Sequence, residues 1–119
     1  MKNLLIVEDS FIDLNNFIPL FLRKGFNVLI TRSGAEALKI IEHSPPDIIL
    51  LDVILPDISG FNVCQQLKQK AATQKIPVVI CSIRKSELEQ FWGLKTGANA
   101  YLTKPVGQEN LISTIDRLV

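Results

Sequence analysis

The sequence has few cysteines and no apolar run of membrane-spanning length. Its two cysteines, Cys64 and Cys81, exclude a disulfide-dense secreted scaffold, and without clustered histidines they make a poor zinc site. Both lie among apolar residues, which predicts buried free thiols in a reducing compartment. The short apolar run that follows Lys2 ends in acids, which is not the pattern of a signal peptide. We therefore expect a cytoplasmic protein that does not insert into a membrane.

Charge of one sign is also scarce. Thirteen basic residues and twelve acidic ones give a net charge of +1, which argues against direct binding to nucleic acid. Apolar residues are plentiful, at 47% of the chain, so a sizeable core is expected and disorder is not. The length of 119 residues suits one domain, and we expect that domain to span residues 1–119.

Short apolar runs alternate with segments of helical periodicity. The runs predict strands at 4–7, 26–31, 47–52, 77–82 and 100–103. The periodic segments predict helices at 10–24, 35–43, 61–70, 86–96 and 108–119, the first bent at Pro19. In the fourth of these helices we expect Trp92 to pack on the helix face with Leu88, with a partly exposed edge; the alternative is that Trp92 contacts a partner protein. Such alternation is typical of an α/β fold whose parallel sheet has helices on both faces.

Residues with distinctive chemistry stand where the predicted strands end. Glu8 and Asp9 follow the first strand, Asp52 ends the third, Ser82 ends the fourth, and Lys104 follows the fifth. The carboxyl ends of parallel strands lie at one edge of the sheet, where α/β proteins bind their ligands. If the first and third strands are neighbours, the three carboxylates converge.

Three carboxylates in one cleft repel each other, and a hard divalent cation such as Mg²⁺ relieves that repulsion. A cation, a lysine and a hydroxyl together can hold a phosphoryl group, and an aspartate can carry it covalently. The residues leave a simpler alternative open: Glu8 and Asp9 can cap the first helix, and Asp52 can be a solvated end of a strand.

Four segments in order also resemble bacterial response-regulator receiver domains, and the resemblance runs from end to end. These segments are LIVEDS at 5–10, DIILLD at 47–52, LPDISGF at 55–61 and GANAYLTKP at 97–105. The resemblance implies a flavodoxin-like, doubly wound sheet of five parallel strands in the order 2-1-3-4-5, with five helices. It also implies a function, that of a phosphorylation-activated switch in a two-component signalling system.

The resemblance assigns the acids. It implies that Asp52 is the phosphoacceptor. It also implies that Glu8, Asp9, Asp52 and the backbone carbonyl of Ile54 hold Mg²⁺.

The resemblance also assigns the other strand ends. Ser82 matches the hydroxyl position of the family, and Lys104 matches the lysine that precedes a cis-prolyl bond, here to Pro105. Tyr101 matches the aromatic position whose rotamer reports activation. Ile83 departs from the family pattern, because the residue after the hydroxyl is usually small, and a bulky side chain there is expected to slow the entry or exit of the phosphoryl group.

The implied partners are a cognate histidine kinase and a downstream effector protein. We expect the effector to bind the surface formed by residues 86–101, which the hydroxyl and the lysine flank. A narrower likeness, in residues 81–82 and 91–101, is to single-domain regulators of type IV pilus motility and phototaxis (the PilG/PilH group). On this interpretation the chain is not an enzyme that turns over exogenous substrates.

Three alternatives stay open at this point. A pseudo-receiver would bind proteins without control by phosphorylation, and Ile83 weakly favours it. A haloacid-dehalogenase-type phosphatase would place an acid-x-acid pattern after the first strand, where this chain has the adjacent Glu8 and Asp9. A redox flavodoxin would have a Gly- or Ser-rich phosphate loop there, and none is present.

Overall fold

The computed structural model describes all 119 residues and has five parallel strands that alternate with five helices. The strands are β1 (Asn3–Val7), β2 (Asn27–Thr31), β3 (Ile48–Leu51), β4 (Val78–Ser82) and β5 (Ala100–Thr103). The helices are α1 (Phe11–Arg23), α2 (Gly34–His43), α3 (Gly60–Gln69), α4 (Glu87–Lys95) and α5 (Gln108–Leu118). The strand order is β2-β1-β3-β4-β5, so the predicted doubly wound topology is confirmed.

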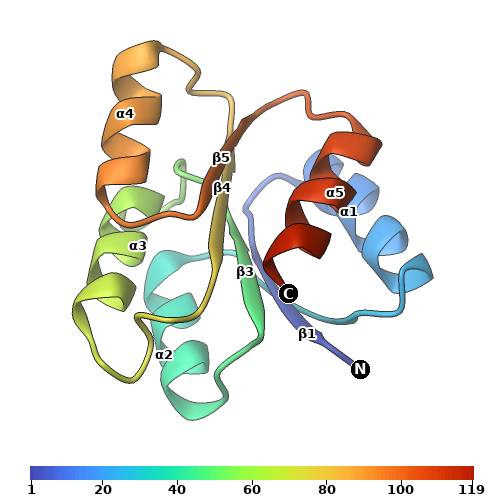
Figure 1. Cartoon of the computed structure of the whole chain (residues 1–119), viewed down its shortest axis with the longest axis horizontal. Helices are drawn as coiled ribbons and strands as arrows, with labels where there is room; N and C mark the ends of the chain where they lie inside the picture. The colour runs from blue at the N-terminus through green and yellow to red at the C-terminus, as the bar shows by residue number, and fades with distance from the viewer.

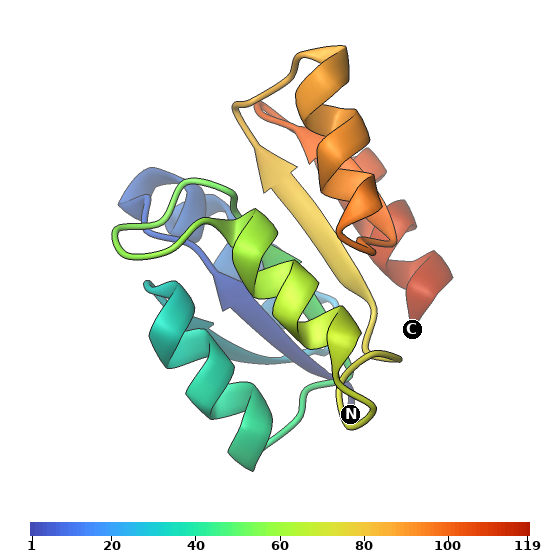
Figure 2. The ribbon, with the colours of Figure 1, turned by 90° about the vertical axis from the view of Figure 1, so that its left-hand side faces the viewer.

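Helices cover both faces of the sheet. Figure 1 shows α1 and α5 on one side and α2, α3 and α4 on the other, and Figure 2 looks onto the second side. Each side encloses a cluster of 13 buried apolar residues. The central strands β1 and β3 supply both clusters because successive side chains of a strand point to opposite faces. This double burial explains why β1 and β3 are nearly continuous apolar runs.

Serine side chains cap the starts of four helices. Ser10, Ser33, Ser59 and Ser86 each accept a hydrogen bond from a backbone N–H of the first turn of α1, α2, α3 and α4. Gly97 lies just after the end of α4 with a φ of 104°, a conformation that favours glycine. These signals set the helix bounds within a residue or two of those expected from the sequence.

Helix α4 is packed differently from the prediction. Its only buried residue is Gly93, and the expected packing of Trp92 with Leu88 is wrong, because their exposed fractions are 56% and 64%. Trp92 instead stacks edge-on against Phe91, with ring centroids 5.5 Å apart. The helix therefore presents an apolar outer surface. None of the helices is both long and apolar enough to cross a membrane.

Candidate active site

The backbone brings the ends of the strands together at one edge of the sheet. The N–H of Glu8 donates to the carbonyl of Thr31 over 3.0 Å, and the N–H of Asp52 donates to the carbonyl of Val7 over 3.0 Å. At the other side of Asp52, the N–H of Lys104 donates to the carbonyl of Ser82 over 2.9 Å. The acids of β1 and β3 and the lysine after β5 therefore share one edge.

Lys104 lies at the centre of this edge. Its Nζ donates to Glu8 Oε1 over 2.7 Å, to Asp13 Oδ2 over 2.7 Å and to Asp52 Oδ2 over 3.1 Å. The side chains of Lys104, Glu8 and Asp52 are at most 8% exposed, whereas that of Asp13 is 27% exposed. The structure thus joins three of the residues singled out from the sequence and adds one, Asp13, that was not singled out.

Sequence reasoning missed Asp13 although a signal was available. It stands in the first turn of the helix that follows Glu8 and Asp9, so its side chain starts at the same edge of the sheet. An acid in the first turn of a helix is commonly explained by its favourable interaction with the helix dipole. That explanation gives no reason to expect a contact with Lys104, which is 91 residues away in the sequence.

The charges of the site are unbalanced. Burial raises the pKa of Glu8 to about 7; the bond from Lys104 opposes this rise, and the neighbouring Asp52 adds to it. Burial alone would lower the pKa of Lys104, but its bonds to Asp13 and Glu8 and the charge of Asp52 outweigh burial and raise it. Lys104 is therefore a permanent cation that three carboxylates share, which leaves room for further positive charge.

Asp9 lies apart from the other acids, and the expectation that all three carboxylates converge is wrong for it. Its Oδ1 pairs with Arg32 Nη2 at 3.1 Å, and Arg32 also lies 3.9 Å from the centre of the Phe11 ring. The neighbouring Glu8 instead contacts Lys104 in the cleft. Accordingly no three acidic, histidine or cysteine side chains gather closely enough to hold a metal.

The donor types nevertheless suit a hard cation. Glu8 and Asp52 are buried acids with oxygen donors, and burial, with Asp52 nearby, raises the pKa of Glu8. The pair between Asp9 and Arg32 is nearly half exposed on both sides, and pairs of that kind contribute little stability. Asp9 can therefore leave Arg32 for a cation at small cost. The residues fit Mg²⁺ if that exchange occurs.

The loop after Asp52 is held by its own contacts. The N–H of Ile54 lies 3.4 Å from Asp52 Oδ1, and Gly60 N–H donates to the carbonyl of Val53. A Cβ on Gly60 would stand 2.0 Å from the carbonyl oxygen of Asp52, so this close approach requires glycine. The carboxylate of Asp57 accepts from the N–H groups at the start of α2, and these bonds lower its pKa. The Asp52 loop is thereby tied to α2.

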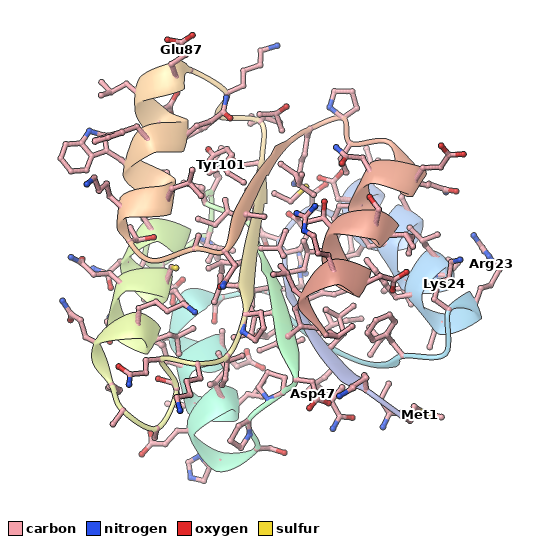
Figure 3. All side chains as sticks on the ribbon, in the orientation of Figure 1. Met1, Arg23, Lys24, Asp47, Glu87 and Tyr101 are labelled. Carbon is pink, nitrogen blue, oxygen red and sulfur yellow. The ribbon has the colours of Figure 1, made fainter.

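Ser82 and Tyr101 meet on the other side of the site. Ser82 is fully buried, and its Oγ accepts from the N–H of Arg84 over 3.2 Å. The Tyr101 hydroxyl donates to the carbonyl of Arg84, and its ring packs on Gly93 and faces Phe61. Figure 3 shows the Tyr101 side chain between α4 and the sheet. Burial, with the negative charge of Glu89, raises the pKa of Tyr101.

The remaining predicted features are also placed. The Lys104–Pro105 peptide bond is cis. Ile83, in the loop beside Ser82, is 62% exposed, and Ile54, in the loop after Asp52, is 42% exposed. On the surface of residues 86–101, Leu88, Phe91, Trp92 and Leu94 are each about half exposed or more.

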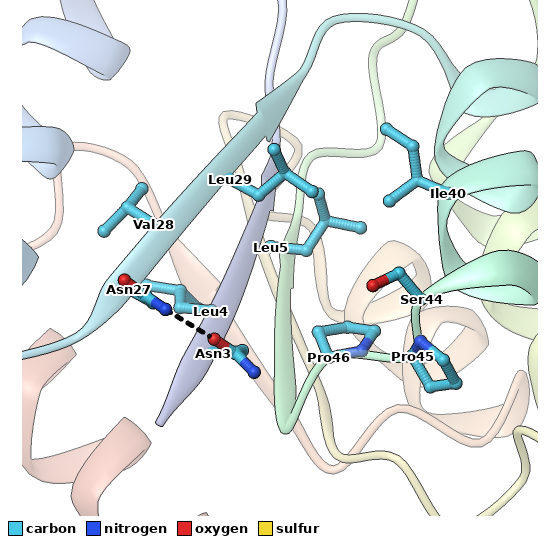
Figure 4. Close-up of a pocket in the computed structure, with 10 residues that line it drawn as sticks. All are labelled: Asn3, Leu4, Leu5, Asn27, Val28, Leu29, Ile40, Ser44, Pro45 and Pro46. Atoms are coloured by element: carbon cyan, nitrogen blue, oxygen red, sulfur yellow. Dashed lines mark hydrogen bonds between the residues drawn. The ribbon is translucent and has the colours of Figure 1, made fainter. Parts of the chain in front are cut away.

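The molecule also has a hollow away from this site. It lies between β1, β2 and α2, where Leu29 and Ile40 face the start of the strands (Figure 4). None of its lining residues titrates near neutral pH, and it opens at the amino ends of the strands, opposite the acids. The acids and the lysine described above therefore lie at the edge of the sheet opposite this hollow.

The chain is similar to known proteins along nearly its whole length. The family model described as the response regulator receiver domain matches residues 4–116. Protein PilH of Pseudomonas aeruginosa is 34% identical over 119 residues, which are 100% of this chain and 98% of PilH. The sensory transduction protein RegX3 of Mycolicibacterium smegmatis is 37% identical over 97% of this chain, which spans about half (49%) of RegX3.

Solved structures share the fold. A CheY-like response regulator receiver domain protein from Methanospirillum hungatei superposes with a TM-score of 0.90 at 26% identity, covering 98% of this chain and 92% of that one. The receiver domain of a Pseudomonas aeruginosa sensor histidine kinase has a TM-score of 0.90 at 22% identity, covering 98% and 96%; that structure has a magnesium ion in its active site cleft.

Proposed function

The chain belongs to the response-regulator receiver family, and from that premise we propose that it is a switch turned on by phosphorylation of Asp52. The single observation that supports this proposal most is the contact of the buried Asp52 carboxylate with the ammonium of Lys104, beside the buried Glu8. An acid, a lysine and further acids at one edge of a parallel sheet suit phosphoryl transfer better than structural capping, because capping has no need of Lys104.

The proposed reaction is a displacement at phosphorus. A carboxylate oxygen of Asp52 forms a bond to the phosphorus of the donor, and the bond from phosphorus to the donor nitrogen or oxygen breaks with its electron pair leaving on the donor. Lys104 stays protonated and donates to a phosphoryl oxygen. Glu8, Asp9, Asp52 and the backbone carbonyl of Ile54 would hold Mg²⁺, which would supply further positive charge for the phosphoryl oxygens. Release of Arg32 by Asp9 completes that ligand set.

Phosphorylation is proposed to change the surface next to the site. The Ser82 hydroxyl, now bonded to the N–H of Arg84, is drawn to the phosphoryl group, and the Arg84 loop follows it. Because Tyr101 bonds to the carbonyl of Arg84, its side chain couples that loop to the surface of residues 86–101. The phosphoryl group thereby favours one of two pre-existing arrangements of this surface.

Receiver domains act between histidine kinases and effectors, and we propose the same partners here. The half-exposed Phe91 and Trp92 suit contacts with an effector protein, because aromatic side chains are enriched in the centres of interfaces. If substitutions across this surface leave the affinities of all partners unchanged, the proposed effector surface is wrong. The similarity to PilH supports a role in motility. We also propose that the receiver domain spans residues 1–119 and that the protein is cytoplasmic.

A second candidate function is that of a pseudo-receiver that binds proteins without phosphorylation. The exposed Ile83, in the loop beside the buried Ser82, favours it, since a bulky residue there can hinder a phosphodonor. The two candidates differ in one observable: only the switch incorporates a phosphoryl group.

The test is labelling of the chain by acetyl phosphate with Mg²⁺, measured by intact-protein mass spectrometry. The wild-type chain is expected to gain the mass of one phosphoryl group, which acid or hydroxylamine removes, and Asp52→Asn is expected to gain none. Asp47→Asn is the matched control, because Asp47 is exposed at the amino end of the same strand. Labelling of Asp52→Asn would overturn the assignment of the acceptor, and no labelling of the wild type would favour the pseudo-receiver.

A further inference from the structure

Asp13 has a contact that its position on α1 does not require. Its backbone N–H is bonded to the capping Ser10, so the start of the helix is satisfied without the side chain. The Asp13 carboxylate instead reaches Lys104 Nζ at 2.7 Å, as close as Glu8 and closer than Asp52 at 3.1 Å. An ammonium has three N–H donors, and here three carboxylates use all of them.

A phosphoryl group on Asp52 extends beyond the carboxylate, so Lys104 has to lean toward it and give up one present bond. Glu8 is 3% exposed, and loss of its bond to Lys104 would leave a buried carboxylate with only the N–H of Ser10 as a partner. Asp13 is 27% exposed, so water can replace the ammonium at its oxygens. Of the two bonds that Lys104 makes to residues other than the acceptor, the one to Asp13 therefore exchanges at lower cost.

We propose that Asp13 is a positioning residue that holds Lys104 on the α1 side of the cleft and competes with the incoming phosphoryl group for its ammonium. This inference rests on the proposed function of Asp52. Asp13 touches neither donor nor acceptor and acts through Lys104 alone. Its expected effect is to slow the phosphorylation of Asp52, so its removal speeds the reaction.

The test is the rate of labelling by acetyl phosphate in Asp13→Asn, Asp13→Ala and Asp13→Glu. The Asn and Ala variants are expected to react about fivefold faster than the wild type, which is about 1 kcal/mol of activation free energy. Asp13→Glu keeps a carboxylate that can reach the ammonium, so its rate is expected to stay within about twofold of the wild-type rate, which is about 0.4 kcal/mol of activation free energy. The Ala variant preserves the test if the Asn variant does not fold, because the Asp13 side chain caps nothing.

The matched control is Glu109→Gln, which removes one exposed carboxylate from the first turn of α5, where it has no ion pair. It separates competition for Lys104 from a general fall in negative charge. At about 1 M salt the Debye length is about 3 Å, so a distant charge effect disappears while a direct contact persists. The gain of Asp13→Asn is expected to persist at that salt concentration, and Glu109→Gln is expected to match the wild type.

Each outcome decides the matter. Equal rates for Asp13→Asn and the wild type, a gain that salt abolishes, or a gain in Asp13→Glu as large as in Asp13→Asn overturns the positioning role and leaves the function of Asp52 intact. Absence of any label on the wild type overturns the proposed function itself, and the inference falls with it.

Discussion

Replacement of Lys104 by methionine probes the balance of charge at the site, because it removes the ammonium and keeps much of the side-chain volume. Removing one partner of a buried ion pair costs about 3–5 kcal/mol, and we expect about 2–3 kcal/mol here, because a buried carboxyl can take up a proton. Glu8 is that carboxyl, with a pKa already raised to about 7 by burial. Because Lys104 holds the pKa of Glu8 down, its removal raises that pKa further. The loss of stability should therefore grow as the pH rises above 7, where Glu8 ionises beside Lys104 in the wild type but has no ammonium beside it in the variant.

The assay is urea unfolding of both proteins at pH 6 and pH 8, each with and without Mg²⁺. Without the competing ammonium, Mg²⁺ should stabilise Lys104→Met more than the wild type, and saturation at about 100 times Kd adds about 2.7 kcal/mol. The control is Lys24→Met, at an exposed lysine after α1, which should change neither stability nor the Mg²⁺ effect. Unchanged stability in Lys104→Met, or equal Mg²⁺ effects in it and the wild type, would refute this reasoning.

Three further predictions concern single contacts. Gly60→Ala should lower the free energy of unfolding, measured by urea titration, by about 2–3 kcal/mol, because the added Cβ would meet the Asp52 carbonyl. Gly107→Ala is the control: its Cβ would lie in open space, so it should lower the free energy of unfolding by less than about 1 kcal/mol. Burial raises the pKa of the Cys81 thiol to about 12 and raises that of Cys64, so iodoacetamide at pH 8 should modify neither in the folded protein and both in urea, as mass spectrometry can count. Arg32→Ala should tighten Mg²⁺ binding up to about fivefold by freeing Asp9, while Arg23→Ala should not, and calorimetry that finds no difference between them would contradict the exchange at Asp9.

The alternation of strands and helices was predictable from local signals, whereas the strand order came from the resemblance to receiver domains. β1 and β3 are buried on both faces, so apart from Asn3 at the start of β1 they contain only apolar residues. Ser10, Ser33, Ser59 and Ser86 mark the starts of helices by a mechanism that acts within three residues. Helix α1 continues through Pro19, as the apolar periodicity of the sequence predicts.

The site was predictable to the level of strand ends and no further. The rule that parallel strands end at one edge placed Glu8, Asp52 and Lys104 together correctly. It says nothing about the direction of a side chain, so it could not separate Asp9, which turns to Arg32, from Glu8, which turns inward. The helical period likewise does not show whether an apolar face of a helix is turned to the core or to solvent. For this reason the sequence predicts packing for Trp92, which is exposed in the structure.

The central claim is that the carboxylate of Asp52 is the phosphoacceptor, and one measurement tests it most directly. Reduction of the phosphorylated chain with borohydride converts an aspartyl phosphate to homoserine, and peptide sequencing by mass spectrometry then locates it. The account predicts homoserine at position 52 and at no other aspartate, in a yield that follows the extent of phosphorylation. Homoserine at another aspartate, or a phosphorylated chain with none at position 52, would contradict it.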